Sequence, residues 1–168
     1  VSWKALPLIA MQVKLANIGK NFQNHSVFKR VNIDIPSGYQ GVILGGNGSG
    51  KSTLLKIISG ALMPSEGRVT YHVNGQEIAA DKAHKYVSFC GPYTDLIEDF
   101  TLVELLAFQA KFKAFLPHVD AKRILERLNL KRFENKLIKT YSSGMKQRVR
   151  LALSVMADTP LLLLDEPT

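Results

Sequence analysis

The sequence predicts an α/β fold in which strands alternate with helices and the first strands form an antiparallel edge region. Two observations predict it. Short apolar runs alternate with segments of helical periodicity along the chain, and the first two runs alternate apolar and polar residues with a period of two. A length of 168 residues is that of about one domain, and it is enough to bury a core.

The N-terminal part contains three predicted strands and one helix. Two half-exposed strands precede a turn at residues 36–38, and a short apolar strand then leads through a glycine-rich loop into a helix that Gly60 ends. The predicted strands are Gln12–Ala16, Val31–Ile35 and Gly41–Leu44, and the predicted helix is Ser52–Ser59.

The rest of the chain is predicted to contain three strands and three helices. The turn Asn74-Gly75 follows the first of these strands, Pro117 separates the first two helices, and Ser142 caps the third. A strand made of four leucines is expected to be parallel and fully buried. The predicted strands are Gly67–Val73, Tyr86–Cys90 and Leu161–Leu164, and the predicted helices are Leu102–Phe115, Val119–Leu128 and Ser143–Met156.

The composition is that of a soluble globular protein, with 46% hydrophobic and 21% charged residues. No apolar run approaches the roughly 18 residues that cross a bilayer, and Val1–Ala10 lacks the features of a signal peptide. The single cysteine, Cys90, cannot form an internal disulfide, which fits a reducing cytosolic compartment. Any membrane role is therefore expected to depend on a partner.

The positive charge is concentrated in one stretch. The net charge is +8, and the segment 111–150 holds 12 lysines and arginines against 3 acidic residues. Such a cluster could attract nucleic acid or anionic lipid. A solvated helix surface is the favoured interpretation, because the basic residues lie on helical segments without interleaved aromatic stacking residues.

The clearest chemical motif is an eight-residue segment between a predicted strand and a predicted helix, and it matches G-x-x-x-x-G-K-[ST]. In such a loop, backbone N–H groups point at phosphates, the lysine bridges the outer phosphates, and the hydroxyl ligates magnesium. A dinucleotide-binding loop is the alternative, but that pattern needs glycine where Lys51 stands. The predicted nucleotide-binding residues here are Gly45, Gly46, Asn47, Gly48, Ser49, Gly50, Lys51, Ser52 and Thr53.

A second acidic motif follows the leucine-rich strand. Asp165 stands at the carboxyl end of Leu161–Leu164, where ligands bind in open α/β sheets, and it is predicted to hold magnesium together with Ser52. Glu166 is placed to orient the attacking water. Without the glycine-rich loop, this pair could equally be the polar end of a core strand.

Together with that loop, the segments Tyr141–Arg148 (YSSGMKQR) and Leu161–Thr168 (LLLLDEPT) resemble the ATP-binding subunit of ABC transporters. The resemblance implies a P-loop NTPase core with a mostly parallel sheet, an N-terminal antiparallel β subdomain and an inserted helical subdomain. The implied domains are an N-terminal extension over residues 1–10 and an ATP-binding domain over 11–168. That domain is expected to be incomplete at its C-terminus, with its helical subdomain at about 96–150.

The first of these segments is similar to the family's signature, LSGGQ. It retains Ser142 and Gly144, whereas Tyr141, Ser143 and Met145 depart from the pattern. In the family this motif contacts the γ-phosphate held by the opposite subunit, so the resemblance implies a head-to-tail dimer with two ATP molecules between the subunits. A helix N-terminus capped by a serine suits an anion, although the triplet alone would be only a helix cap.

Two further family positions can be examined. Phe22 stands where the family stacks an aromatic ring on adenine, with a core residue as the alternative. The family's glutamine that bridges magnesium and the transmembrane partner should follow Tyr86–Cys90, but the segment Gly91–Asp95 contains none. Either Tyr93 or Asp95 replaces part of its contact, or the coupling to the transmembrane partner runs differently.

The end of the chain also departs from the family, whose members continue with further strands and a histidine that contacts the γ-phosphate. The four histidines of this chain all precede the acidic strand. A truncated chain or an incomplete gene model is therefore expected, and a chain that ended here would have an unpaired apolar edge beside the P-loop strand. The isolated 168 residues are expected to bind nucleotide weakly and to hydrolyse it poorly.

The implied function is Mg²⁺-dependent ATP hydrolysis that powers a membrane transporter, with Lys51 and Glu166 as catalytic residues. The resemblance implies a cytoplasmic subunit, peripheral on the membrane through a permease on a separate chain and paired with a second ATP-binding subunit. The alternatives are a soluble ABC-type ATPase acting on the ribosome or nucleic acid, and a nucleotide-binding module without catalysis. Nucleic acid is the less favoured partner.

Overall fold

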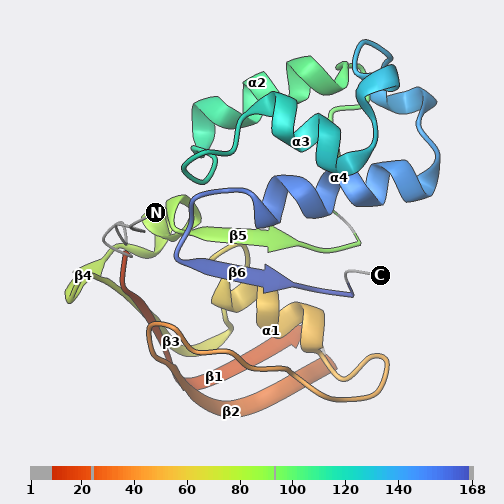
Figure 1. Cartoon of the computed structure of the whole chain (residues 1–168). Helices are drawn as coiled ribbons and strands as arrows, with labels where there is room; N and C mark the ends of the chain where they lie inside the picture. The colour runs from red at the N-terminus through yellow and green to blue at the C-terminus, as the bar shows by residue number, and fades with distance from the viewer. Residues whose placement is uncertain (1–8, 24, 93, 167–168) are drawn as a thin grey trace. The chain divides into compact units, whose positions relative to one another are not determined.

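The computed structural model of the protein describes residues 9–23, 25–92 and 94–166. The chain divides into two compact units, Val1–Val87 and Ser88–Thr168, each with its own buried side chains. Helices and strands occur in both (Figure 1). The boundaries expected for the ATP-binding domain and its helical subdomain stay predictions, and most of the expected extension over 1–10 lies outside the described residues.

The first unit is built on a four-stranded antiparallel sheet of order β2-β1-β3-β4, which confirms the predicted antiparallel region (Figure 1). The central strand pairs on both sides, because Val13 lies opposite Ile35 on one neighbour and opposite Tyr71 on the other. Asn74 and Gly75 both have positive φ, as a tight two-residue hairpin turn requires. The strands are β1 (Met11–Phe22), β2 (His25–Ile35), β3 (Glu66–Val73) and β4 (Gln76–Ile78).

One helix, α1 (Lys51–Ile58), packs against this sheet. Its buried residues Ile57 and Ile58 join the inward residues of β1, and the buried Tyr71 hydroxyl of β3 donates a hydrogen bond to the Ile57 carbonyl at 3.1 Å. A short 3₁₀ turn, Ala80–Lys85, follows β4 and brings Ala83 beside Gly60, where α1 has ended. The sheet therefore holds the C-terminal end of α1 by both packing and a hydrogen bond.

The predicted strand Gly41–Leu44 is wrong. The segment joins no sheet within the described residues, and Val42 and Leu44 are 78% and 83% exposed. An apolar run becomes a strand only where a neighbouring strand satisfies its backbone groups. The sequence shows the apolar run but says nothing of the neighbour.

The second unit contains a two-stranded sheet of β5 (Val87–Cys90), which begins at the unit boundary, and β6 (Leu161–Leu164). Their arrows point in the same direction, as the predicted parallel arrangement requires (Figure 1). The expectation that β6 is fully buried is wrong, because Leu163 is buried whereas Leu162 and Leu164 are each 39% exposed. Successive strand residues point to opposite faces, so the two exposed leucines lie on the same face of β6.

Three helices complete the second unit, and their apolar sides form one cluster of buried residues. Local capping defines their starts: Thr101 and Glu104 form a capping box, and the Asp120 side chain accepts from the Arg123 N–H at 2.8 Å. Two helices are shorter than predicted at the ends near Pro117. The helices are α2 (Leu102–Phe112), α3 (Ala121–Leu128) and α4 (Ser143–Val155), with 3₁₀ turns at Lys131–Phe133 and Ile138–Thr140.

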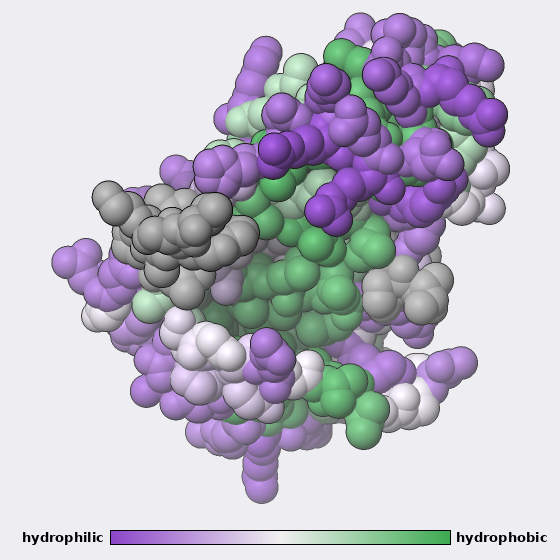
Figure 2. Space-filling view, viewed as in Figure 1, coloured by the Kyte–Doolittle hydropathy of each residue, from purple (hydrophilic) through white to green (hydrophobic). Residues whose placement is uncertain are grey.

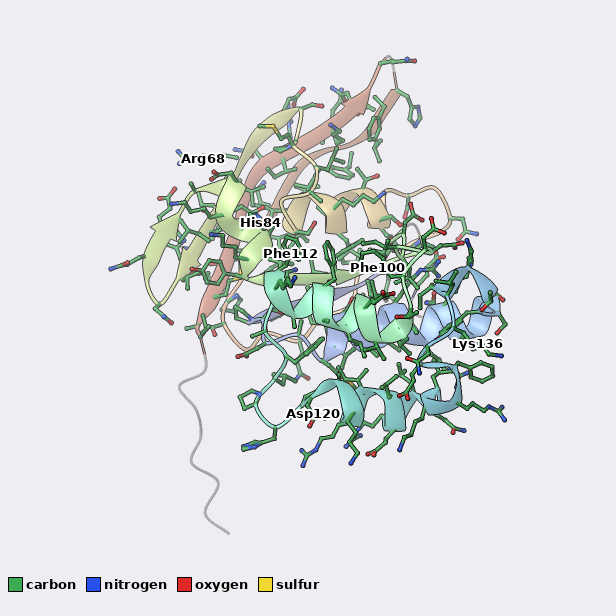
Figure 3. The ribbon with its side chains drawn as sticks, turned by 90° about the horizontal axis from the view of Figure 1, so that it is seen from above. Arg68, His84, Phe100, Phe112, Asp120 and Lys136 are labelled. Carbon is green, nitrogen blue, oxygen red and sulfur yellow. The ribbon has the colours of Figure 1, made fainter. Side chains whose placement is uncertain are left out.

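Three phenylalanine rings, one before α2 and two on it, pack against one another. Phe108 packs edge-on against Phe100, with ring centroids 5.6 Å apart, and lies 4.8 Å from Phe112; Figure 3 labels the two outer rings. Such pairs add to the stability that burial alone provides. Phe100 also packs against the cluster of buried residues that the three helices share.

The basic stretch is mostly on the exterior of the second unit. Hydrophilic residues cover the outer side of these helices in Figure 2, and Lys136, labelled in Figure 3, is exposed. Lys136 and Arg132 both lie over the ring of Phe133, at 5.3 and 4.9 Å from its centroid. Among the described residues, no helix is long and apolar enough to cross a membrane.

Candidate nucleotide-binding site

The glycine-rich loop leads directly into α1, and its backbone geometry depends on glycine. Gly48 and Gly50 have φ of 78° and 92°, in the left-handed region that other residues enter only with strain. The Ser49 N–H donates to the Gly46 carbonyl at 3.3 Å, which tightens the turn. The loop predicted from the sequence is thus a compact bend at the start of a helix.

Close contacts explain two of the glycines. A Cβ on Gly50 would lie 2.6 Å from Cγ1 of Val27 and 3.0 Å from Cδ1 of Phe28, and a Cβ on Gly45 would lie 2.6 Å from the Ser49 hydroxyl. A Cβ on Gly46 would meet nothing within 4 Å. The end of the loop therefore packs tightly on β2, while its middle is open.

Lys51 lies over the loop. Its Nζ donates to the carbonyl oxygens of Gly45 and Gly46, each at 2.9 Å, so the loop backbone positions the ammonium group. Gly50 has no side chain with which to cap the first turn of α1, and the helix begins with the Leu54 N–H donating to the Gly50 carbonyl. A cation beside the positive end of a helix is the arrangement that favours phosphate.

Phe22 is not a core residue, because it is 49% exposed. It ends β1 and pairs with His25, while Lys20 pairs with Phe28, the residue that Gly50 touches. The hairpin end that carries Phe22 therefore lies near the end of the glycine-rich loop. The Lys20 ammonium sits 4.9 Å from the ring centroid, so this ring face already holds a cation.

In the second unit, Asp165 and Glu166 follow β6 but differ in environment. Asp165 is 4% exposed, and its N–H donates to the Cys90 carbonyl of β5 at 2.7 Å. Glu166 is exposed and has a φ of 47°. The chain thus turns sharply after the strand, leaving one carboxylate held against the sheet and the next at the surface.

Ser142 caps α4, as predicted. Its hydroxyl accepts from the Met145 N–H at 3.3 Å, and Ser142, Ser143 and Gly144 are all exposed. Tyr141 is buried, and its hydroxyl donates to the Phe133 carbonyl at 2.8 Å. The tyrosine therefore packs in the helical core, while the next three residues are exposed at the start of α4.

The segment after β5 holds a contact that sequence reasoning missed. The Arg150 Nε on α4 donates to the Thr94 carbonyl at 2.8 Å, and Ser154 donates to the Phe89 carbonyl at 3.2 Å. The polar spacing of Gln147, Arg150 and Ser154 along one helix face was the available signal. Asp95 lines a cavity beside Arg150, and Tyr93 lies outside the described residues.

The predicted site residues are divided between the two units. In the first unit, the loop, Lys51 and the hairpin end with Phe22 are neighbours; Ser142, Gly144, Asp165 and Glu166 belong to the second. No cluster of three His, Cys, Asp or Glu side chains occurs within the described residues. The hydroxyl of Ser52 and the buried carboxylate of Asp165 are oxygen donors of the kind magnesium prefers, and Mg²⁺ commonly takes only one or two carboxylates beside phosphate and water.

Comparison with known proteins identifies a family over most of the chain. The family described as "ABC transporter" matches residues 28–168. The sulfate/thiosulfate import ATP-binding protein CysA of Synechocystis is 32% identical over 161 residues, which are 94% of this chain and 45% of that protein. The human ATP-binding cassette sub-family A member 10 is 32% identical over 165 residues, 93% of this chain and 11% of that protein. The chain thus spans less than half of the length of these relatives.

Solved structures agree on the fold. The ATP-binding subunit of an ABC transporter superposes with a TM-score of 0.77 at 25% identity, covering 92% of this chain and 66% of that one. A dimeric ATP-binding cassette in a post-hydrolysis state, bound to ADP and Pi, superposes with a TM-score of 0.75 at 28% identity, covering 93% and 74%. The expected P-loop NTPase fold is confirmed.

Proposed function

This chain belongs to the ABC transporter family, and we propose that it is the nucleotide-binding part of an ATP-driven transporter that binds and hydrolyses Mg²⁺-ATP. One observation carries the proposal, the geometry of the loop Gly45–Ser52. Two of its glycines adopt left-handed φ angles, the Lys51 ammonium is hydrogen-bonded to its carbonyls, and helix α1 begins at its end. That arrangement is suited to a triphosphate.

Nucleotide binding is assigned to the first unit. The loop N–H groups and the start of α1 would hold the β- and γ-phosphates, and Lys51 would leave the Gly45 and Gly46 carbonyls to pair with phosphate oxygens. Phe22 would stack on adenine, because its exposed ring lies near the end of the loop. The bound nucleotide would thus use residues from β1, the loop and α1. The proposed loop contacts are Gly45, Gly46, Asn47, Gly48, Ser49, Gly50, Ser52 and Thr53.

Hydrolysis is assigned to residues of both units. Ser52 and Asp165 would hold Mg²⁺, which when bound neutralises charge on the phosphate oxygens. Glu166 would orient the attacking water, a role for which its exposed carboxylate is available. Lys51 would stabilise the charge that develops on the transferred phosphoryl group.

Assembly is the third part of the proposal. Ser142 and Gly144 are exposed at the capped start of α4, where they would contact the γ-phosphate bound by a second copy or a related subunit in a head-to-tail dimer. A separate permease chain would carry the cargo, which is supported by the similarity to a protein named as the ATP-binding protein of an import system. The protein would then lie on the cytoplasmic face of that permease.

Two substitutions test the separate roles of Lys51 and Glu166. Lys51→Ala should weaken Mg²⁺-ATP binding about tenfold or more, because a charge-assisted phosphate contact is lost. Glu166→Gln should keep binding while it lowers phosphate release strongly. Lys122→Ala removes an exposed lysine of α3 and serves as the control. Equal loss of binding in the Lys51 and Glu166 variants would overturn this division of roles.

The same assay distinguishes the alternatives. Binding without phosphate release in the wild-type protein would identify a nucleotide-binding module without catalysis. Stimulation of phosphate release by RNA or ribosomes would instead assign the exposed basic residues near α3 to a nucleic-acid partner.

A further inference from the structure

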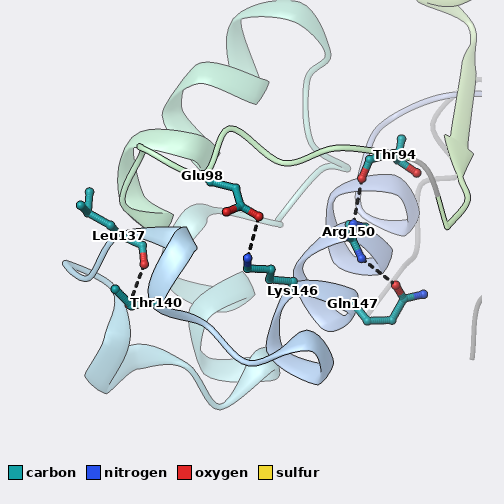
Figure 4. A network of polar contacts seen from close by, with 7 residues as sticks. All are labelled: Thr94, Glu98, Leu137, Thr140, Lys146, Gln147 and Arg150. Atoms are coloured by element: carbon teal, nitrogen blue, oxygen red, sulfur yellow. Dashed lines mark hydrogen bonds and ion pairs between the residues drawn. The ribbon is translucent and has the colours of Figure 1, made fainter.

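Helix α4 presents a row of polar side chains to the segment that leaves β5. Ser154 donates to the Phe89 carbonyl at 3.2 Å, and the Arg150 Nε donates to the Thr94 carbonyl at 2.8 Å. Gln147 accepts from the Arg150 guanidinium at 3.1 Å, which fixes the plane of that group (Figure 4). Since these positions are spaced by three and four residues, one face of α4 makes all of these bonds.

The segment held by Arg150 is itself folded into a tight turn. The Gly91 N–H donates to the Thr94 hydroxyl at 2.8 Å, and the Thr94 N–H donates back to the Gly91 carbonyl at 3.1 Å. The turn begins at Gly91, directly after β5, and Arg150 is hydrogen-bonded to its last residue, Thr94.

The same turn is connected to the candidate metal ligand. The Asp165 N–H donates to the Cys90 carbonyl at 2.7 Å, immediately before Gly91. A Cβ on Gly91 would lie 3.4 Å from the Asp165 Cβ, so the turn and the carboxylate are in van der Waals proximity. A continuous set of bonds thus runs from α4, through Thr94 and Gly91, to the backbone of Asp165.

We propose that Arg150 is a positioning residue, which clamps the turn after β5 onto α4 and thereby holds Asp165 in place for magnesium. The magnesium in this inference rests on the proposed function, whereas the hydrogen bonds of Arg150 do not. The clamp also links α4, whose first residues are proposed to contact the nucleotide of a partner subunit, to Asp165 in the same unit.

Lysine cannot replace arginine in this clamp. The guanidinium is planar and uses two different nitrogens, Nε toward Thr94 and a terminal nitrogen toward Gln147. An ammonium group keeps the charge but loses this fork. The difference allows the charge and the geometry to be tested separately.

The only cysteine in the chain is a natural reporter of the clamp. Cys90 is fully buried, and burial raises the pKa of its thiol, while Ser154 and the positive charge of Arg150 oppose that rise. Arg150 also lines a cavity of about 140 Å³ with Thr94 and Ser154. Loosening the turn would expose the thiol to reagents.

The first test is the rate at which iodoacetamide labels Cys90 in the 168-residue chain. Arg150→Lys should accelerate labelling about tenfold, because one charge-assisted hydrogen bond is lost while the nearby charge is kept. Arg148→Lys is the matched control: Arg148 also donates to a carbonyl, that of Leu128 at 3.0 Å, but on a different element. Equal rates in both variants and the wild type would overturn the clamp.

A second variant loosens the turn from the other side. Thr94→Val removes the hydroxyl that binds Gly91 and leaves α4 untouched, so it should accelerate Cys90 labelling in the same direction. It decides the outcome if Arg150→Lys does not fold. Unchanged labelling in Thr94→Val would contradict the role of the turn.

The third measurement tests the link to magnesium. For Arg150→Lys, the Mg²⁺ concentration that gives half-maximal ATP hydrolysis should rise about tenfold, while binding of a fluorescent ATP analogue in EDTA stays at the wild-type value. An unchanged Mg²⁺ requirement would show a merely structural clamp and overturn the positioning role. If the wild type binds no nucleotide but labelling responds to Arg150, the proposed function fails and the clamp stands.

Discussion

Gly50 meets two demands that no other residue can satisfy. Its φ is 92°, and a Cβ would lie 2.6 Å from Val27 Cγ1. Gly50→Ala should therefore lower the free energy of unfolding by about 1–3 kcal/mol and weaken nucleotide binding. Urea unfolding measures the first effect. Gly46→Ala is the control for stability, since its Cβ would meet nothing within 4 Å, and an equal loss in both variants would contradict the account.

Tyr71 couples the sheet to α1, and its titration reports that coupling. Burial raises the pKa of Tyr71 to about 12 from its ordinary 10. A raised folded-state pKa means that its stabilising contribution is complete below pH 10 and is lost as the pH rises through about 12. Tyr71→Phe should cost about 1 kcal/mol at neutral pH, through the lost bond to Ile57, and should reduce the alkaline loss of stability.

Urea unfolding between pH 8 and 12 checks this prediction. Tyr39→Phe is the matched control, because Tyr39 is 59% exposed. If the Tyr71 variant loses stability between pH 10 and 12 as steeply as the wild type does, the coupling is not through this hydroxyl.

At the scale of elements, the start of α2 depends on a reciprocal cap. The Thr101 N–H and the Thr101 hydroxyl both donate hydrogen bonds to the Glu104 carboxylate. The backbone bond, and to a smaller extent the hydroxyl bond, lower the pKa of that carboxyl below its usual 4.5. A lowered folded-state pKa gives stability that is present above pH 4.5 and is lost as the pH falls through the folded value. Glu104→Gln should remove this part of the acid dependence, measured by thermal unfolding from pH 3 to 6. The same change at Glu126, an exposed residue within α3, should leave it intact.

Local patterns predicted the elements well because their causes are local. Period-two alternation marked β1, although the structure extends it to Phe22, and serine before a helical run marked the Ser142 cap. Gly41–Leu44 and the exposed side of β6 were predicted wrongly, because pairing and cover come from residues distant in sequence. The motif spacing predicted the bend around Lys51, whereas the Arg150 contact required knowing which face of α4 meets the turn.

At the scale of the whole molecule, the proposed catalytic cycle requires two copies of the site. Glu166→Gln should accumulate a dimer in Mg²⁺-ATP, because nucleotide would bind and not be hydrolysed. Analytical ultracentrifugation measures the dimer fraction, and adding Gly144→Val should abolish it by crowding the exposed start of α4. A Glu166→Gln protein that stays monomeric at saturating Mg²⁺-ATP would contradict head-to-tail pairing between two copies of this chain.

Every role proposed for this chain requires that the bend at Gly45–Ser52 binds a triphosphate. Isothermal titration of the 168-residue chain with Mg²⁺-ATP tests it most directly, with Lys51→Ala titrated alongside. We expect saturable heat for the wild type, even at weak affinity, and about tenfold weaker or absent binding for the variant. No saturable heat in the wild-type chain, or identical binding by the two proteins, would contradict it.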